Sequence, residues 1–145
     1  MRKAITRKGR HNAPIREQAR LFFARLQGNP AGTDILHEQN HRIEFDLEDG
    51  HPFYVEILRG KVKVRAGSYH PRRFDSPDLI HFQLKTETLV RMFSGKIRFT
   101  DALIPADPNG KDRMLLLECG LFKWSVLNWV GRLFRAGQLP SRYLD

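Results

Sequence analysis

Three consecutive segments in the middle of the chain alternate apolar and polar residues with a period of two. The alternation begins at residues 42–48 and returns at 53–57 and at 62–66. A β-strand sends successive side chains to opposite faces, so this pattern predicts three strands, each with one apolar and one wet face. The breaks between them contain Gly50 and Gly60 and are short. We therefore predict an antiparallel meander.

Helical spacing occurs on both sides of this meander. Residues 13–27 carry an apolar stripe that predicts a helix, and Asn29 to Gly32 reads as a break before a short helix that begins at Thr33. The elements predicted after the meander are a fourth strand at 80–84, a short helix capped by Thr86, a single helical turn from Thr100, a fifth strand at 113–118 and a closing helix at 121–137. This order predicts an α+β fold, in which helices pack on one face of a five-stranded, mostly antiparallel sheet.

Length and composition fit one domain. The chain has 145 residues, of which 41% are hydrophobic, which is enough for a single core. We expect an N-terminal arm at residues 1–12, one domain at 13–137 and a C-terminal tail at 138–145. No apolar run reaches the roughly 18 residues that a membrane span needs. The single cysteine, Cys119, excludes an internal disulfide and a thiolate-rich zinc site, and together these features predict a cytoplasmic protein.

Positive charge is concentrated in the arm. Five of the nine net positive charges of the chain fall in residues 1–12, which contain no acidic residue. A basic arm can bind anionic lipid headgroups, at about 1 kcal/mol per basic residue, or the phosphates of nucleic acid. A solubilising tail has the same composition. The arm therefore predicts an anionic partner, and peripheral contact with an anionic membrane is the interpretation that we carry forward.

One motif suggests an enzyme. His37-Glu38-x-x-His41 has the spacing at which zinc peptidases place two metal ligands and a general base. That chemistry needs one continuous helical turn carrying both histidines. Strand-like alternation begins by Ile43, and no third histidine follows at the extended spacing. We therefore predict two solvated histidines at a helix-to-strand corner, with no metal and no cofactor, and keep a zinc-dependent hydrolase as the alternative.

The segment LIHFQLKTETLVRMFSGK, at residues 79–96, contains a strand, a Thr-x-x-Leu helix and a Gly-Lys stop. A short helical piece, a strand ending near a glycine and an amphipathic closing helix follow it. This order resembles the sterol carrier protein type-two family of small lipid-binding domains, from about Arg42 to Gly137. Two features depart from the family pattern: the loop IPADPNGKD at 104–112 is longer than usual, and Cys119-Gly120 stands where a glycine followed by a polar residue is commoner.

Members of that family hold a sterol, fatty acid, acyl-CoA or other lipid in an apolar tunnel between sheet and helices, and most are not catalytic. The resemblance therefore implies a lipid-binding and lipid-transport protein with a hydrophobic pocket, no catalytic residue and no cofactor. The pocket residues that it implies are Phe53, Val55, Ile80, Phe82, Leu89, Phe93, Phe99, Leu103, Phe122, Val126, Trp129, Val130 and Leu133.

The closing helix gives support that does not depend on the resemblance. Its apolar residues occupy an arc wider than a helix lying on one surface needs, which suits the wall of a cavity, although ordinary cores contain such arcs as well. Trp124 and Lys123 break the pattern, because Trp124 projects into the polar arc near Asn128 and Arg135. Trp beside Arg is typical of headgroup-level membrane contact or of a protein interface. Packing of Trp124 against the C-terminal tail is the alternative.

Three functions follow from these patterns. The first is non-catalytic binding and transfer of a hydrophobic ligand, such as a sterol, fatty acid, acyl-CoA or isoprenoid-like lipid. The second is the zinc-dependent hydrolase that uses His37, Glu38 and His41. The third is a nucleic-acid-binding module built on the basic arm, which is disfavoured because the strand aromatics fall mainly on the inner faces of the sheet.

Overall fold

The computed structural model of the protein describes residues 13–69, 79–107, 109–119 and 123–137. The predicted arm at 1–12, the tail at 138–145 and Phe122 lie outside these residues. The helices and strands are α2 (Ala13–Gln27), α3 (Pro30–Leu36), β1 (Asn40–Leu47), β2 (Phe53–Leu58), β3 (Lys61–Ala66), β4 (Leu79–Leu84), α4 (Thr86–Ser94), α5 (Phe99–Leu103), β5 (Met114–Glu118) and α6 (Lys123–Ala136).

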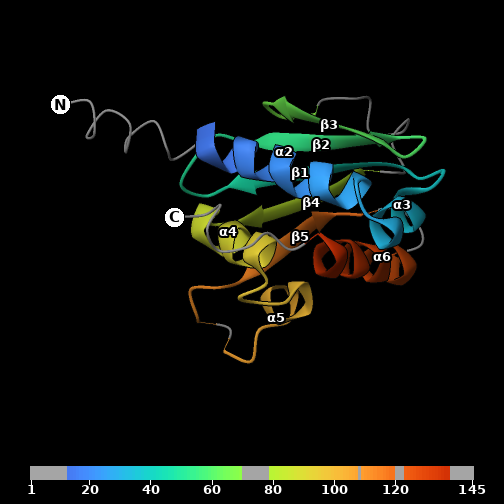
Figure 1. The fold of residues 1–145 in the computed structure, drawn as a ribbon. Coiled ribbons are helices and arrows are strands. Elements are labelled where there is room, and N and C mark those ends of the chain that lie inside the picture. The colour runs from blue at the N-terminus through green and yellow to red at the C-terminus, as the bar shows by residue number, and fades with distance from the viewer. Residues whose placement is uncertain (1–12, 70–78, 108, 120–122, 138–145) are drawn as a thin grey trace.

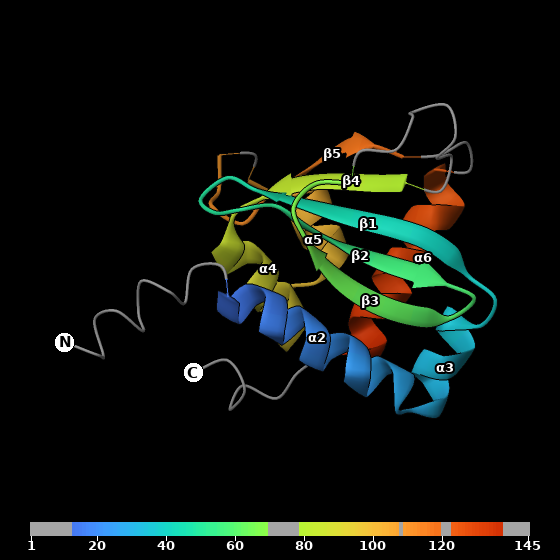
Figure 2. The same cartoon turned by 90° about the horizontal axis from the view of Figure 1, so that it is seen from above.

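The five strands form one sheet in the order β3-β2-β1-β4-β5. Three of the neighbouring pairs are antiparallel, and β1 runs parallel to β4, so the sheet is mixed and mostly antiparallel. The described helices lie on one side of the sheet (Figures 1 and 2). The predicted α+β fold is therefore confirmed, including the meander of β1, β2 and β3 and the single helical layer.

The parallel pair follows from the connection between β3 and β4. A parallel neighbour requires the chain to cross over, because a tight hairpin can join only antiparallel strands. Tyr69, at the start of this connection, lies on the face of the sheet that the helices leave open. Its ring is 5.3 Å from the Tyr54 ring and 4.8 Å from the Arg42 guanidinium. The described start of the connection therefore lies on the open face of the sheet.

The core lies between the sheet and the helices. The inner face of each of the three central strands carries three fully or almost fully buried apolar side chains: Ile43, Phe45 and Leu47 in β1, Phe53, Val55 and Ile57 in β2, and Ile80, Phe82 and Leu84 in β4. Full burial of one such side chain contributes about 1.5–3 kcal/mol. The period-two pattern of the sequence therefore identified the inner face correctly.

The short helix α3 begins earlier than predicted. Asn29 is its cap, because the Asn29 side chain accepts a hydrogen bond of 2.7 Å from the Gly32 backbone N–H, and Pro30 occupies the first turn. The sequence interpretation of Asn29 to Gly32 as a break was wrong, since an Asn-Pro pair also suits a helix start.

Helix α4 also differs from the prediction, in which Thr86 was the cap. Thr86 is instead the first residue of the helix, and Lys85 precedes it. The Asp49 carboxylate accepts hydrogen bonds from the Thr86 backbone N–H and hydroxyl at 2.8 and 2.9 Å.

None of the helices among the described residues combines the length and the apolar character needed to cross a membrane.

Two helical glycines are in opposite environments, and this generates a prediction. A Cβ atom on Gly32 would lie 1.8 Å from the Leu26 carbonyl oxygen, whereas one on Gly131 would lie 3.6 Å from the Phe99 ring. Gly32→Ala should therefore lower the free energy of unfolding by about 3 kcal/mol through overpacking. Gly131→Ala should raise it by about 0.5–1 kcal/mol, because alanine favours the helix. Urea denaturation measures both, and an unchanged Gly32→Ala midpoint would contradict the close approach of α3 to α2.

Candidate functional site

The pocket residues predicted from the sequence come together in one cluster. Ten of them are buried: Phe53, Val55, Ile80, Phe82, Leu89, Phe93, Phe99, Trp129, Val130 and Leu133. Leu103 and Val126 are partly buried and pack against the same cluster, and Phe122 lies outside the described residues. The sequence therefore identified residues that share one interior.

That interior is filled by aromatic rings. Phe22 of α2 lies 4.8 Å from Phe93 and 5.5 Å from Phe134, measured between ring centroids. Phe99 stacks on Phe134 at 5.8 Å and meets Phe82 of the sheet at 5.5 Å. These are ordinary spacings for packed aromatic pairs. The tunnel expected between sheet and helices is thus not confirmed, because these side chains occupy the centre of the space that it would need.

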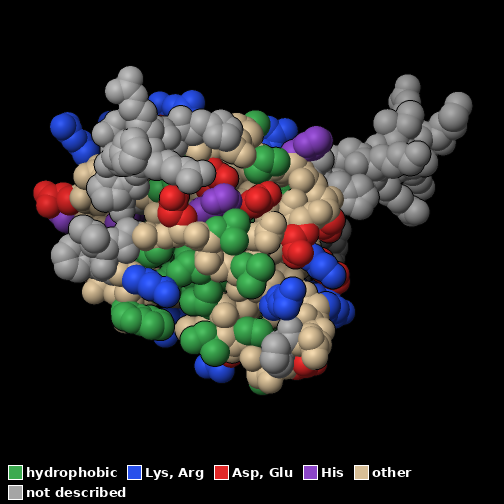
Figure 3. Space-filling view, turned by 180° about the vertical axis from the view of Figure 1, so that it is seen from behind, with side chains coloured by type: hydrophobic (Ala, Val, Ile, Leu, Met, Phe, Trp, Pro, Cys, Tyr) green, Lys and Arg blue, Asp and Glu red, His purple; other side chains and the backbone are tan. Residues whose placement is uncertain are grey.

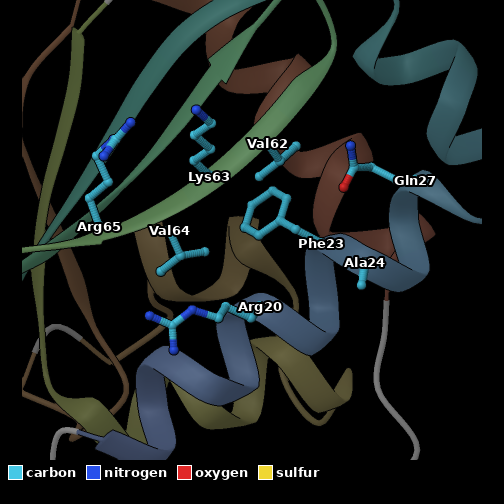
Figure 4. A pocket seen from close by; sticks show the side chains of 8 residues that line it. All are labelled: Arg20, Phe23, Ala24, Gln27, Val62, Lys63, Val64 and Arg65. Carbon is cyan, nitrogen blue, oxygen red and sulfur yellow. The ribbon is translucent and has the colours of Figure 1, made fainter.

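A groove opens at one edge of this interior, between helix α2 and strand β3 (Figure 4). It has a volume of about 380 Å³ and is lined by Arg20, Phe23, Ala24, Gln27, Val62, Lys63, Val64 and Arg65. The Val62 and Val64 side chains point from β3 toward α2, where the Phe23 ring meets them, whereas Lys63 and Arg65 point away from the helix. The groove therefore has an apolar floor, and its volume falls at the lower end of the range of small-molecule sites.

The position of β3 explains this composition. It is an edge strand of the described sheet and pairs with β2, and its alternation places valines toward α2 and cations on the other face. Phe23 belongs to the buried stripe of α2, whereas Ala24 is exposed one position further along. The Arg20 guanidinium pairs with Glu17, and that of Arg65 pairs with Glu56 at 3.4 Å. Two of the basic side chains at the rim of the groove are therefore paired with acidic residues. The apolar floor is the feature of the groove that suits a hydrophobic ligand.

The groove was not predicted from the sequence. The sequence does place Phe23 on a helical stripe and Val62 and Val64 on the inner face of a strand. Their meeting depends on the strand order, which puts β3 at the edge beside α2. Strand order has no local signal in the residues of the groove, so only the tertiary structure brings them together.

The metal motif does not have the helical geometry of a zinc peptidase. Helix α3 ends at Leu36, Glu38 adopts a left-handed backbone with φ of 57°, and His41 belongs to strand β1. His37 is exposed, whereas the His41 ring packs 4.6 Å from the Trp129 ring. One helical turn therefore does not carry both histidines, as the chemistry requires. No group of three or more His, Cys, Asp and Glu side chains in the described parts of the chain is placed to hold a metal ion.

Trp129 has a structural role that the sequence pattern did not show. Its indole N–H donates a hydrogen bond of 2.8 Å to the Ile35 carbonyl oxygen, which joins α6 to α3. The pattern predicted an apolar wall residue, and the ring is indeed buried. A buried carbonyl at the end of a short helix needs such a partner, so Trp129 holds α3 in place as well as filling the core.

The open face of the sheet contains a buried charge. Glu44 was predicted to face water, but only 4% of its surface is exposed. Its carboxylate accepts a hydrogen bond of 2.7 Å from the Tyr69 backbone N–H and lies 3.0 Å from His81 Nε2. Tyr69 follows β3, and His81 lies on the neighbouring strand β4, so both of these neighbours come from later in the chain. Glu44 therefore anchors the start of the crossover on the sheet.

Comparisons with known proteins identify the fold. No protein-family model matches the chain, and no curated protein sequence matches it. The crystal structure of sterol carrier protein 2 superposes with a TM-score of 0.57 and 10% sequence identity, over 84% of this chain and 94% of that one. The solution structure of a conserved hypothetical protein from Thermus thermophilus, described as possibly a sterol carrier protein, superposes with a TM-score of 0.53 and 11% identity, over 84% of this chain and 85% of that one.

Both superpositions cover most of each chain, so they include the sheet together with its helical layer. The low identity means that they concern the backbone arrangement and not the side chains of the groove. The resemblance proposed from the sequence is therefore confirmed for the fold: this chain has the sterol carrier protein 2 fold.

Proposed function

We propose that this protein binds a hydrophobic ligand, such as a sterol, fatty acid, acyl-CoA or isoprenoid-like lipid, and transfers it without catalysing a reaction. The observation that carries the proposal is the groove between α2 and β3, whose floor of Phe23, Val62 and Val64 continues into the apolar interior. The fold supports it, because sterol carrier protein 2 has the same architecture. A cytoplasmic location, and contact of the basic arm with anionic membranes, remain predictions.

The ligand would enter under the free edge of the sheet. Among the described strands none lies beyond β3, so a small outward movement of α2 would widen the groove. Burial of about eight methylene groups contributes about 6 kcal/mol, whereas separating one pair of aromatic rings costs about 0.5–1.5 kcal/mol beyond its buried area. The free energy of ligand burial can therefore offset some rearrangement of the rings. The interior side chains predicted from the sequence, with Leu89 and Phe93 of α4 among them, would then line the bound chain.

Native mass spectrometry of freshly purified protein tests the proposed class of ligand. We expect an added mass of several hundred daltons that is lost on collisional activation and is recovered by extraction into organic solvent. Bare protein that also fails to take up added fatty acid, sterol or acyl-CoA would contradict lipid binding. An added zinc ion that disappears in a His37→Ala variant would instead support the hydrolase.

Filling the groove tests its role as the entrance. Ala24 lines it and is exposed, so the indole of Ala24→Trp should occupy the space over Phe23. We expect about tenfold weaker binding of a fluorescent fatty acid, which corresponds to about 1.4 kcal/mol. Ala31→Trp is the matched control, because Ala31 is also exposed on a helix but does not line the groove.

The control variant should bind like the wild type, and thermal unfolding should show that both variants are folded. Equal affinities of Ala24→Trp and the wild type would exclude the groove as the entrance. Equal affinities would not contradict lipid binding itself, which native mass spectrometry tests.

A further inference from the structure

Exposed apolar side chains are concentrated in one part of the molecule. Among the described residues, the large exposed hydrophobic side chains are Leu21, Leu58, Ile104, Leu115, Leu117 and Trp124. Four of these six fall between positions 104 and 124, in the segment that runs from the end of α5 through β5 to the first turn of α6. Soluble proteins usually scatter such side chains singly, so a local concentration indicates an interaction site.

The elements that carry or adjoin these four side chains are neighbours in the fold. Helix α5 contacts both β5 and α6, and only a short segment separates the end of β5 from Trp124. Leu115 and Leu117 are exposed, whereas Met114 is buried and Leu116 half-buried on the side of the core. Figure 3, which views the open face of the sheet, shows hydrophobic side chains gathered in the half of the molecule where β5 lies, bordered by Lys and Arg side chains and by Asp, Glu and His side chains. We call Ile104, Leu115, Leu117 and Trp124 the β5 patch.

The two edge strands of the sheet differ in the way they meet solvent. Strand β3 carries Lys61, Lys63 and Arg65, and charged residues of this kind are a common protection of sheet edges. Strand β5 has the sequence MLLLE, with no charge before Glu118. An apolar edge without such protection is a surface on which another molecule can dock. The β5 patch therefore lies at the edge of the sheet whose strand lacks protecting charged side chains.

Charge identifies the kind of partner. The chain carries a net charge of +9, so two copies repel each other, whereas an anionic surface attracts the protein. Trp124 is 68% exposed, and the Lys123 ammonium lies 5.4 Å from the centre of its ring. An indole beside a cation, next to exposed leucines, suits the boundary between lipid headgroups and acyl chains. Arg113, before β5, is also exposed. The acidic side chains beside the patch are Glu118, at the end of β5, and Asp46, whose partner Gln83 pairs with Leu115.

We propose that the β5 patch docks the protein on an anionic lipid bilayer, with Trp124 at headgroup level and the two β5 leucines in contact with the acyl chains. This surface lies apart from the ligand groove, which is bounded by α2 and β3 at the other edge of the sheet. Docking goes beyond ligand binding and does not depend on which lipid the groove accepts.

Vesicle flotation with the full chain tests the proposal. The probes are phosphatidylcholine vesicles with and without phosphatidylserine. We expect the wild type to float with the anionic vesicles, and Leu115→Ser/Leu117→Ser to bind them at least tenfold more weakly. Leu21→Ser/Leu58→Ser is the matched control, because the exposures of 42% and 39% are close to those of Leu115 and Leu117, at 43% and 49%. The control should bind like the wild type.

Fluorescence gives a second, local measurement. Insertion should shift the wild-type tryptophan emission to the blue, and the shift should be lost in Trp124→Phe, since Trp129 is buried with its N–H bonded. Equal flotation of the wild type and the β5 variant would overturn the proposal in favour of the basic arm. A wild type that ignores vesicles but sediments as a dimer, and becomes monomeric in the β5 variant, would overturn it in favour of a second copy. Ligand content by native mass spectrometry is measured separately, so failure of docking is distinguishable from failure of ligand binding.

Discussion

Three phenylalanine rings lie side by side across the centre of the sheet and form an apolar surface that the helical layer covers. Phe45 of β1 is in register with Phe53 of β2 and with Phe82 of β4, at ring distances of 5.3 and 6.1 Å. All three are fully buried. Because the sheet supplies this apolar surface on one face only, the helices must bring matching apolar side chains to that face. Phe22, Phe93, Phe99 and Phe134 do so, and together they form a single aromatic core.

Local patterns predicted the elements well because each has a strong local cause. Alternation identified the strands, and the stop at Gly95 is real, since Gly95 has a φ of 76°. Gly137 also follows the last turn of α6, but for a different reason: a Cβ there would lie 2.6 Å from the Phe22 ring. The missed features depend on distant residues. Asp49 supplies the partner for the start of α4, and the parallel pairing of β4 with β1 follows from a crossover that no short segment encodes.

For the candidate site, the sequence pattern predicted which side chains are buried but not whether they enclose open space. Periodicity reports which side chains turn inward, and it therefore found the interior residues, but a filled core and an open tunnel require the same apolar pattern. Whether space remains is decided by how the rings meet, as Phe99 meets Phe134. The groove needs the strand order, which places Val64 beside α2. Glu44 was misassigned for a similar reason, since Tyr69, whose backbone N–H binds its carboxylate, lies 25 positions further along the chain.

The two edges of the sheet have complementary tasks in the proposed transfer. At β3, cations face away from the groove and the valines form its floor; at β5, apolar side chains face outward. Five strands at about 4.8 Å spacing separate these edges by about 19 Å. A protein docked through β5 would hold the mouth of the groove away from the bilayer. Exchange of a lipid between that mouth and the bilayer would therefore require the docked protein to rotate so that the groove faces the membrane. A lipid that instead passes beneath the helices must part the rings of Phe82 and Phe99, which close that route in the present conformation.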